Sequence, residues 1–507
     1  MLWYIVSIKL LRFIMKSLKI ALLALLPATL LAAPPYALFS PHQGEEAFEK
    51  MYDYVKGAKK TAHVTIYSWS DGGITDAMED VLKNNPGVKL RVVLHRPLGG
   101  KSSILSKVAK LEAMGAMFKR AKMNMHEKFV LVDSKNLSNS SANMSGGAKN
   151  RYSEDFTFIE SEGEADNEAV IKQFEREFAV IWNSSDDIVT KDEIQKADIL
   201  PLDLDQANLP ATKAAMTLIS SSMNSTLSKN SPTSADYKKG RIIDLNDRYL
   251  PNGDQPYVVS TELIEAIDNA KKSVWLALNH FNLYSVSEAL IRAVKRGVEV
   301  RLSVDNQEFK TKIRDTGSRP SIEMTPRFIR DFNALPGFDK KEAPVRVHFY
   351  SHAPHHSSWH LNHHKFVLID NELPNDAILM AGSFNLSNNA EFNQFDNLVA
   401  YKGAAYAGVI GDYARQHEHL WTLNRNSADK PSKEALDYIK AVYDDSYIRL
   451  HVADPENVVA LTWNEALALK KDMNRVAPGL FRQLYSKKGC MFYNFVKQSY
   501  FGGAGCK

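Results

Sequence analysis

Two histidine–lysine pairs are the residues of this sequence best suited to chemistry. His126 and Lys128 open the segment HEKFVLVD, and His363 and Lys365 open HHKFVLID. Both segments are apolar and β-like, and on a strand residues two apart point to the same face. Each imidazole is therefore expected beside an ammonium group. This arrangement suits a bound phosphate, because the cation neutralises oxygen charge while the imidazole attacks or protonates.

Further polar residues follow both pairs in the same order. An aspartate ends each β-like run, and we expect these two carboxylates to cap turns. A Ser-x-Asn follows in SSANMS and in GSFNLS, and offers neutral hydrogen bonds to phosphoryl oxygens. A later carboxylate, in YSEDF and in QFDNL, is placed to accept from the far nitrogen of a histidine and to stabilise the imidazolium. These residues are Asp133 and Asp370, then Ser141, Asn143, Ser383 and Asn385, then Glu154 and Asp396.

The sequence around the two motifs is an internal duplication. AKKTAHVTIYSW at 58–69 matches AKKSVWLALNHF at 270–281, and a helix-like segment follows each. A glycine then opens a second strand, GVKLRVVLH in one half and GVEVRLSVD in the other. The order strand, helix, strand predicts a parallel crossover and an α/β fold. Each half closes with a helix whose paired aromatic residues we interpret as core anchors: Phe174 and Trp182, then Tyr413 and Trp421.

The predicted organisation is two duplicated α/β lobes, each a mixed sheet flanked by helices. We place the first lobe at 34–185 and the second at 251–425, with a polar linker at 186–250. The C-terminal extension, 426–507, has no counterpart in the repeat, and we expect it to be helical. Its Lys- and aromatic-rich tail would rest on a membrane surface or pack against the second lobe.

The N-terminus favours an exported protein. Lys16 and Lys19 precede a short apolar run, the pattern of a secretory signal at 1–33, with Met15 as an alternative start. If the residues before Met15 extend the apolar region, the segment would instead be an uncleaved anchor. The expected location is extracellular or periplasmic, in association with a target membrane.

Composition, the two cysteines and a histidine-rich stretch say less about function. The 507 residues are 44% apolar and carry a formal charge of +4, which is ordinary for a globular protein and weak for a nucleic-acid binder. The two cysteines would form a disulfide, carry a lipid, or remain unpaired. A histidine-rich stretch before the second motif matches no standard zinc spacing, so we expect a polar loop and no metal. These residues are Cys490 and Cys506, and His352, His355, His356 and His360.

The motifs resemble those of the phospholipase D superfamily, whose hallmark is H-x-K-x4-D followed by G-S-x-N. The resemblance covers about 48–421 without the linker, and Ser140 departs from it by replacing a glycine. It implies two repeats that meet at a pseudo-two-fold interface and share one site without a metal or other cofactor. One histidine is phosphorylated, while the other protonates the leaving alcohol and then activates water.

Carried onto this chain, the resemblance implies His126 as nucleophile and His363 as general acid and base, with the reverse order left open. Lys128 and Lys365 would bind phosphate. The supporting residues would be Ser141, Asn143, Ser383 and Asn385 at the phosphate, and Glu154 and Asp396 beside the histidines, while Asp133 and Asp370 would be structural.

The expected function is a secreted phospholipase D that releases the headgroup of glycerophospholipids and leaves phosphatidic acid, with transphosphatidylation when an alcohol replaces water. We expect a monomer that meets phospholipid at a membrane surface, with no nucleic acid and no obligate protein partner. The alternative is an endonuclease of the same superfamily, which would need a long basic groove and show steep salt dependence. A lipid synthase would normally carry transmembrane helices. Intact pairs in both halves argue against a non-catalytic binding module.

Overall fold

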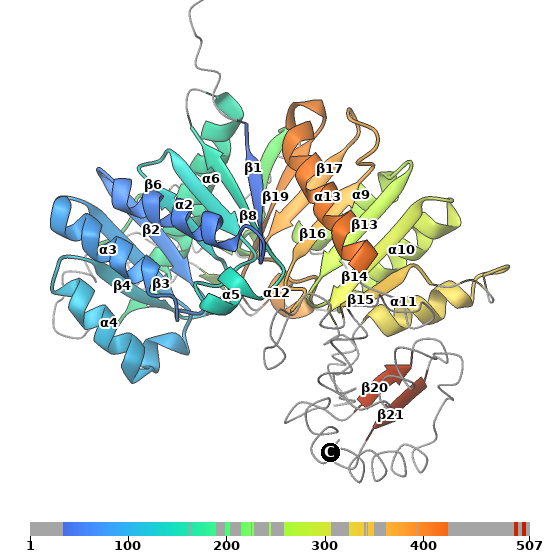
Figure 1. The fold of residues 1–507 in the computed structure, drawn as a ribbon, viewed down its shortest axis with the longest axis horizontal. Helices are drawn as coiled ribbons and strands as arrows, with labels where there is room; N and C mark the ends of the chain where they lie inside the picture. The colour runs from blue at the N-terminus through green and yellow to red at the C-terminus, as the bar shows by residue number, and fades with distance from the viewer. Residues whose placement is uncertain are drawn as a thin grey trace, which may run out of the picture.

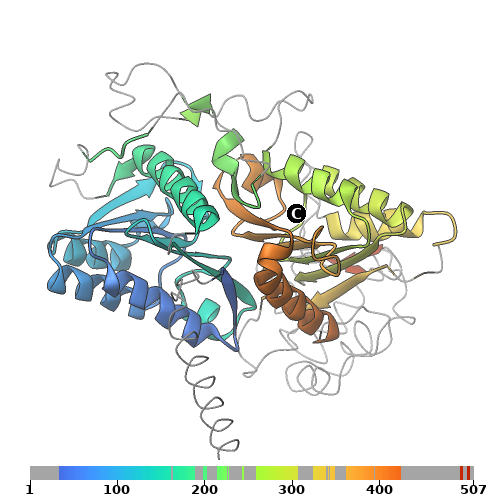
Figure 2. The ribbon, with the colours of Figure 1, turned by 90° about the horizontal axis from the view of Figure 1, so that it is seen from above.

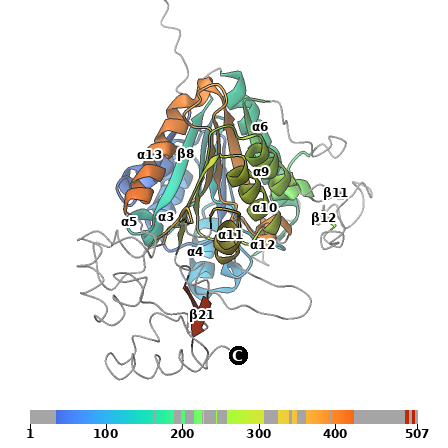
Figure 3. The same ribbon diagram turned by 90° about the vertical axis from the view of Figure 1, so that its right-hand side faces the viewer.

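The computed structural model of the chain shows two lobes side by side, each with one β-sheet and helices on both of its faces (Figures 1 and 2). A long helix closes each repeat, α6 (Ala165–Asn183) in the first and α13 (Ala407–Leu423) in the second. Seen from the side, these two helices lie on opposite sides of the sheets, as a two-fold relation between the lobes requires (Figure 3). The structure describes residues 34–161, 164–188, 198–202, 214–224, 258–305, 324–338, 343–348, 361–392 and 394–423, with the short pieces 226–227, 243–244, 341, 491–494 and 499–502.

The two sheets share one topology. The first has the strand order β1-β8-β7-β6-β2-β3-β4-β9, and the second β10-β19-β17-β16-β13-β14-β15. In each lobe three neighbouring strands are parallel, as the strand–helix–strand pattern predicts, and the other pairings are antiparallel. The duplication read from the sequence is therefore a duplication of the fold. The first-lobe strands are β1 (Tyr36–Ser40), β2 (Thr61–Ile66), β3 (Lys89–Leu94), β4 (Met117–Ala121), β6 (Phe129–Val132), β7 (Asn136–Ser140), β8 (Glu154–Glu160) and β9 (Ser185–Asp187). Their second-lobe equivalents are β10 (Met216–Ser220), β13 (Ser273–Leu278), β14 (Glu299–Asp305), β15 (Val345–His348), β16 (Lys365–Ile369), β17 (Ile378–Gly382) and β19 (Asn397–Lys402).

Helices cover the sheets in equivalent places, so that the central strands are buried on both faces. In α3 the buried positions follow the spacing of one helix face, which is why this segment forms an amphipathic helix. These positions are Ile74, Ala77, Met78, Val81 and Leu82. The remaining helices are α2 (Gly44–Gly57), α3 (Gly73–Asn84), α4 (Ser102–Glu112) and α5 (Gly146–Asn150), matched by α9 (Val258–Asn269), α10 (Tyr284–Lys295), α11 (Met324–Asn333) and α12 (Asn388–Phe392).

One of the hydrophobic clusters joins the two lobes. It contains Phe174, Trp182 and Tyr413 of the closing helices together with sheet residues of both lobes. Helix α6 packs against β10 of the second sheet, and α13 packs against β1 of the first. Trp421 differs from the expected core anchor, because it is only half-buried and lies beneath the guanidinium of Arg346, 4.3 Å from the ring centre.

The predicted linker contributes to both lobes. Its residues 216–220 form β10, which pairs antiparallel with β19, so the second lobe begins well before the expected boundary at 251. Asp198 at the other end is held on the first lobe by Arg91, whose Nε and Nη2 donate to its carboxylate at 2.6 and 2.9 Å. A single five-residue strand in polar surroundings has too little periodicity to be recognised in the sequence.

Little of the C-terminal extension is described. It contains one antiparallel pair, β20 (Met491–Asn494) with β21 (Ser499–Gly502). The helices expected in this extension, both cysteines, the histidine-rich stretch 352–360 and the signal segment 1–33 lie outside the described residues. Within the described part of the chain, no helix is long and apolar enough to cross a bilayer.

The motif aspartates hold the starts of β2 and β13. Asp133 accepts hydrogen bonds from the backbone of residues 59–61, and Asp370 from residues 271–273, at 2.6–3.1 Å. Both have a positive φ, 54° and 48°, a conformation that aspartate tolerates better than most residues. This is the structural, turn-capping arrangement expected from their places at strand ends.

We predict that Asp370→Ala lowers the free energy of unfolding by about 2–3 kcal/mol, because three backbone N–H groups lose a charged acceptor. Urea denaturation measures the change. Asp376→Ala is the matched control, since Asp376 forms an exposed ion pair with the neighbouring Lys271 and should cost about 0–1 kcal/mol. Equal losses in the two variants would contradict a capping role.

Candidate active site

The two histidine–lysine motifs meet where the lobes join. His126 lies between β5 (Asn124–Met125) and β6, and His363 lies two residues before the start of β16. The strands β6 and β16 lie in the middle of the two sheets. Both imidazoles are nearly buried, with exposed fractions of 6% and 8%. The structure thus brings the two motifs into a single site.

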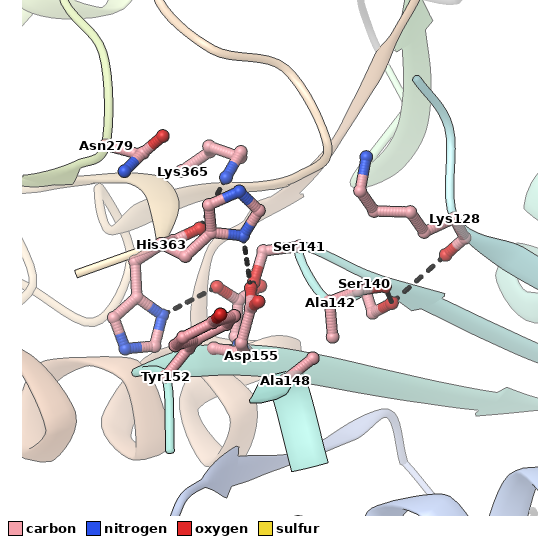
Figure 4. Close-up of polar contacts among 12 residues, drawn as sticks. Lys128, Ser140, Ser141, Ala142, Ala148, Tyr152, Asp155, Asn279, His363 and Lys365 are labelled. Carbon is pink, nitrogen blue, oxygen red and sulfur yellow. Dashed lines mark hydrogen bonds and ion pairs between the residues drawn. The ribbon is translucent and has the colours of Figure 1, made fainter. Parts of the chain in front are cut away.

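Each histidine is paired with a carboxylate from the opposite lobe. His126 Nδ1 lies 2.9 Å from Asp396 Oδ1, and His363 Nδ1 lies 2.7 Å from Glu154 Oε2. Figure 4 shows His363 close to Ser141, which follows β7, and to Asp155 of β8, both in the first lobe. Because each carboxylate accepts from Nδ1, the tautomer with a free Nε2 is favoured in both rings. Neither half could hold its own histidine in this way without the other.

Backbone hydrogen bonds also join each histidine to the opposite lobe. The N–H of His126 donates to Phe395 O, and the N–H of His363 donates to Ser153 O, both at 2.9 Å. Phe395 and Ser153 directly precede the two partner carboxylates. The distance between a histidine and its carboxylate is therefore set by main-chain contacts as well as by the side chains.

The serines of the Ser-x-Asn segments contact the carboxylates. Ser141 Oγ donates to Glu154 Oε2 at 2.7 Å, and Ser383 Oγ donates to Asp396 Oδ1 at 2.6 Å. Each hydroxyl also accepts from the N–H of the residue after that carboxylate. Both serines were expected to bind the phosphate, and in this structure their hydroxyls orient the carboxylates.

The asparagines of the same segments lie in the loops after β7 and β17. The loops are held against the ends of β2 and β13 by isolated bridges, Trp69 with Met144 and Phe281 with Leu386. The side-chain oxygens of Asn143 and Asn385 are buried and have no hydrogen-bond partner among the described residues. Side-chain amides with unused hydrogen-bonding capacity suit a polar ligand.

Glycine is needed in only one of the two repeats. A Cβ atom at Gly382 would lie 2.5 Å from Asn397 O, so a side chain cannot be accommodated there. Ser140 occupies the equivalent place in the first repeat, where its hydroxyl donates to Lys128 O at 3.1 Å. The departure of Ser140 from the expected glycine thus leaves the first motif intact.

The two lysines place buried ammonium groups in the site. Lys128 and Lys365 have exposed fractions of 1% and 0%, and each Nζ donates to the carbonyl of the histidine two residues before it. Among the described residues, no carboxylate forms an ion pair with either ammonium group. Burial lowers the pKa of Lys128 to about 7 and that of Lys365 to about 8. An anionic ligand would restore the charge of both.

Burial also acts on the histidine–carboxylate pairs. It raises the pKa of Glu154 and of Asp396 to about 7, against the opposing effects of the lysines and serines. Burial, followed by the neighbouring lysine, lowers the pKa of His126 and of His363 well below the usual value. Without an anion in the site, both imidazoles are therefore neutral at neutral pH. A neutral imidazole with a free Nε2 is a competent nucleophile.

The residues between each histidine and lysine, Glu127 and His364, make contacts of their own. His364 Nδ1 lies 2.8 Å from Asp155 Oδ1, and Tyr413 donates to the other oxygen of Asp155 at 2.9 Å. In the other repeat, burial, followed by the charge of Glu177, raises the pKa of Glu127 well above its usual value. The two sides of the interface therefore differ in chemistry although they share a fold.

Two residues near the site were missed by the sequence analysis. His95 directly follows β3 and Asp305 ends β14, and their side chains accept hydrogen bonds from the residues before His126 and His363. A polar residue that ends an apolar strand at the same place in both repeats is the signal that could have identified them.

Comparisons with known proteins agree with this geometry. The model of a family described as "Cardiolipin synthase, PLD-like domain" matches residues 51–182 and 263–421, more than half of the chain. A mitochondrial cardiolipin hydrolase of Danio rerio is 26% identical over 155 residues, which are 30% of this chain and 64% of that relative, so less than two-thirds of its length is matched. The crystal structure of a phosphatidylserine synthase from Haemophilus influenzae covers 83% of this chain and 96% of its own, with a TM-score of 0.51 and 12% identity, a likeness of fold alone.

A duplicated α/β frame that brings two His-x-Lys motifs into one shared site defines a class of enzyme that acts on phosphodiesters. The chain belongs to the phospholipase D superfamily, as the match over both repeats shows.

We predict that the affinity for sulfate, a dianion across this range, falls about tenfold or more from pH 6 to pH 9. The pKa of Lys128 is lowered to about 7 and that of Lys365 to about 8, so positive charge is present below these values and is lost above them. Calorimetric titration measures the affinity. Lys365→Met should weaken binding at pH 6, whereas the exposed Lys83→Met should not. Affinity independent of pH would contradict a site built on these two ammonium groups.

Proposed function

We propose that the chain is a phospholipase D, which hydrolyses the distal phosphodiester of glycerophospholipids to phosphatidic acid and a free headgroup. The proposal rests on an exchange of carboxylates between the lobes: each lobe supplies the carboxylate that holds the histidine of the other. This exchange directs two imidazoles into one site beside two buried ammonium groups. Such a site supplies what a phosphodiester requires: a nucleophile, a proton donor and compensation of oxygen charge.

In the first half of the reaction, His126 Nε2 attacks phosphorus and the bond from phosphorus to the headgroup oxygen breaks. His363 Nε2 gives its proton to that oxygen, so the headgroup leaves as an alcohol. His363 is neutral before substrate binds, but the negative phosphodiester offsets the charges of Lys128 and Lys365 and favours its protonation. Glu154 then stabilises the imidazolium through Nδ1.

In the second half, the neutral His363 accepts a proton from water while the water oxygen attacks the phosphohistidine. The bond between phosphorus and His126 Nε2 breaks, which leaves His126 neutral and His363 protonated. When phosphatidic acid leaves, His363 releases this proton to solvent and the starting state is restored. A positioned proton donor and acceptor of this kind contributes about 10²–10⁴-fold to the rate. An alcohol in place of water would give a new phosphodiester, which is transphosphatidylation.

Two observations support a lipid substrate. The formal charge of +4 over 507 residues is weak for a protein that tracks a nucleic-acid backbone. The matching family model and both relatives carry names that refer to phospholipids or their hydrolysis and synthesis. The signal-like segment 1–33 supports export, so we place the reaction at an extracellular or periplasmic membrane surface.

An assay with purified protein, chelator present, tests the substrate class. We expect phosphatidic acid release from a panel of phospholipids and no nicking of plasmid DNA. Nicked DNA without lipid turnover would replace the lipid substrate by a nucleic acid.

We predict that His126→Ala and His363→Ala each lower kcat on phospholipid by at least about 10²–10⁴-fold, because each removes a group that acts on the reacting bonds. A phosphodiester of p-nitrophenol separates their roles, since this leaving group departs without a proton. His363→Ala should release one equivalent of p-nitrophenol per site and then stop, whereas His126→Ala should release none.

The exposed His42→Ala is the control and should keep normal turnover. Normal turnover in either active-site variant would reject the two-histidine mechanism. A burst in His126→Ala, with none in His363→Ala, would exchange their roles.

A further inference from the structure

Two successive backbone N–H groups hold each catalytic histidine, one from each side of the interface. The N–H of the histidine itself donates to the opposite lobe. The N–H of the preceding residue donates to a side chain of its own lobe: Met125 N–H to His95 Nδ1 at 3.3 Å, and Asn362 N–H to Asp305 Oδ2 at 2.8 Å. These acceptors determine where the histidine backbone lies.

The two acceptors occupy equivalent places. His95 directly follows β3, and Asp305 is the last residue of β14, the strand that corresponds to β3 in the second sheet. The interaction is therefore preserved in both repeats, although an imidazole provides it in one and a carboxyl group in the other. The two repeats thus share this hydrogen bond and differ in the charge of its acceptor.

His95 is a neutral group. Its Nδ1 accepts a hydrogen bond, so this atom carries no proton. Burial, followed by the charges of Lys128 and Lys101, lowers the pKa of His95 to about 4. The ring of Tyr67 lies between His95 and His126, with centre-to-centre distances of 4.4 and 4.6 Å. The first lobe therefore adds no negative charge of its own at this place.

Asp305 lies on the opposite side of the site, with an exposed fraction of 0%. Burial lowers the pKa of Lys365, and Glu154, Asp155, Asp396 and Asp305 oppose that effect. Asp305 is thus one of the negative groups that favour positive charge in the second motif.

The other charged and titratable groups around the two histidines are largely matched. Two lysines face both rings, and each ring has one carboxylate partner on Nδ1. His363 additionally faces His280 and the His364–Asp155 pair. The groups are Lys128, Lys365, His363, His95 and Asp396 around His126, and Lys365, Lys128, His280, His364 and Glu154 around His363.

We propose that His95 and Asp305 are positioning residues for the two catalytic histidines, and that the charge difference between them selects His363 as the proton-carrying histidine and His126 as the nucleophile. This inference rests on the proposed phosphohistidine mechanism. A carboxylate beside the second motif favours the cationic form of His363, whereas a neutral imidazole beside the first leaves His126 unprotonated.

Four substitutions separate charge from position. In His, Asn and Asp the accepting atom is bonded to Cγ, so His95→Asn and His95→Asp both keep an acceptor for Met125 N–H. His95→Asp adds a negative charge, and His95→Asn is its neutral control. Asp305→Asn keeps an acceptor for Asn362 N–H and removes a charge. His95→Ala removes the acceptor and should lower kcat about 10²-fold with little change in KM, because the nucleophile is misplaced.

The readout is kcat against pH at saturating phospholipid, which reports groups in the enzyme–substrate complex. His95→Asp should raise the pKa of His126 and move the acidic limb to higher pH by on the order of one unit, while His95→Asn leaves that limb in place. Asp305→Asn should lower the pKa of His363 and move the alkaline limb to lower pH by a similar amount. A purely structural role would reduce kcat without moving either limb.

Two results would overturn the inference. Movement of the alkaline limb by His95→Asp and of the acidic limb by Asp305→Asn would reverse the assignment of the histidines. Limbs that stay in place in all variants would exclude an electrostatic role. The alanine variants test the proposed function separately: normal turnover in His126→Ala or His363→Ala would contradict it, whatever the pH profiles show.

Discussion

The exchange of carboxylates between the lobes is the interaction on which the site depends. Asp396 of the second lobe holds His126, and Glu154 of the first holds His363, each through Nδ1. Because each lobe supplies the carboxylate for the histidine of the other, the site needs both copies of the fold. The exchange also explains the shared hydrophobic cluster, because α6 and α13 each pack against a strand of the other sheet and thereby keep the carboxylates in register.

Burial gives the site its reactivity. Two ammonium groups, two imidazoles and two carboxyl groups lie almost out of contact with water, where unpaired charge is unfavourable. Burial therefore lowers the pKa of the lysines and histidines and raises that of the carboxyl groups. An entering phosphodiester supplies the missing negative charge. We infer that binding energy is used to charge the lysines and to place a proton on one histidine.

The sequence predicted the parts of this structure that are repeated and failed where local pattern is weak. The duplicated lobes are confirmed, because apolar strands and helix periodicity are directly visible in the sequence. The convergence of both motifs on one site was implied by the family resemblance alone, and the structure brings the two motifs together. Strand β10 was assigned to the linker, since five residues paired only through the tertiary fold have no local signature. Glu154 is nearer in sequence to His126 than to His363. It pairs with His363 because of the way the lobes dock, which has no local signature in the sequence. Roles of individual residues in catalysis remain predictions.

A crystal structure with bound vanadate tests the central claim most directly. The account predicts one vanadate ion between the lobes, with His126 Nε2 as an axial ligand, His363 Nε2 hydrogen-bonded to the opposite axial oxygen, and both lysines at equatorial oxygens. Vanadate held by one lobe alone, or two ions in separate pockets, would contradict a single phosphorus site shared by the two repeats.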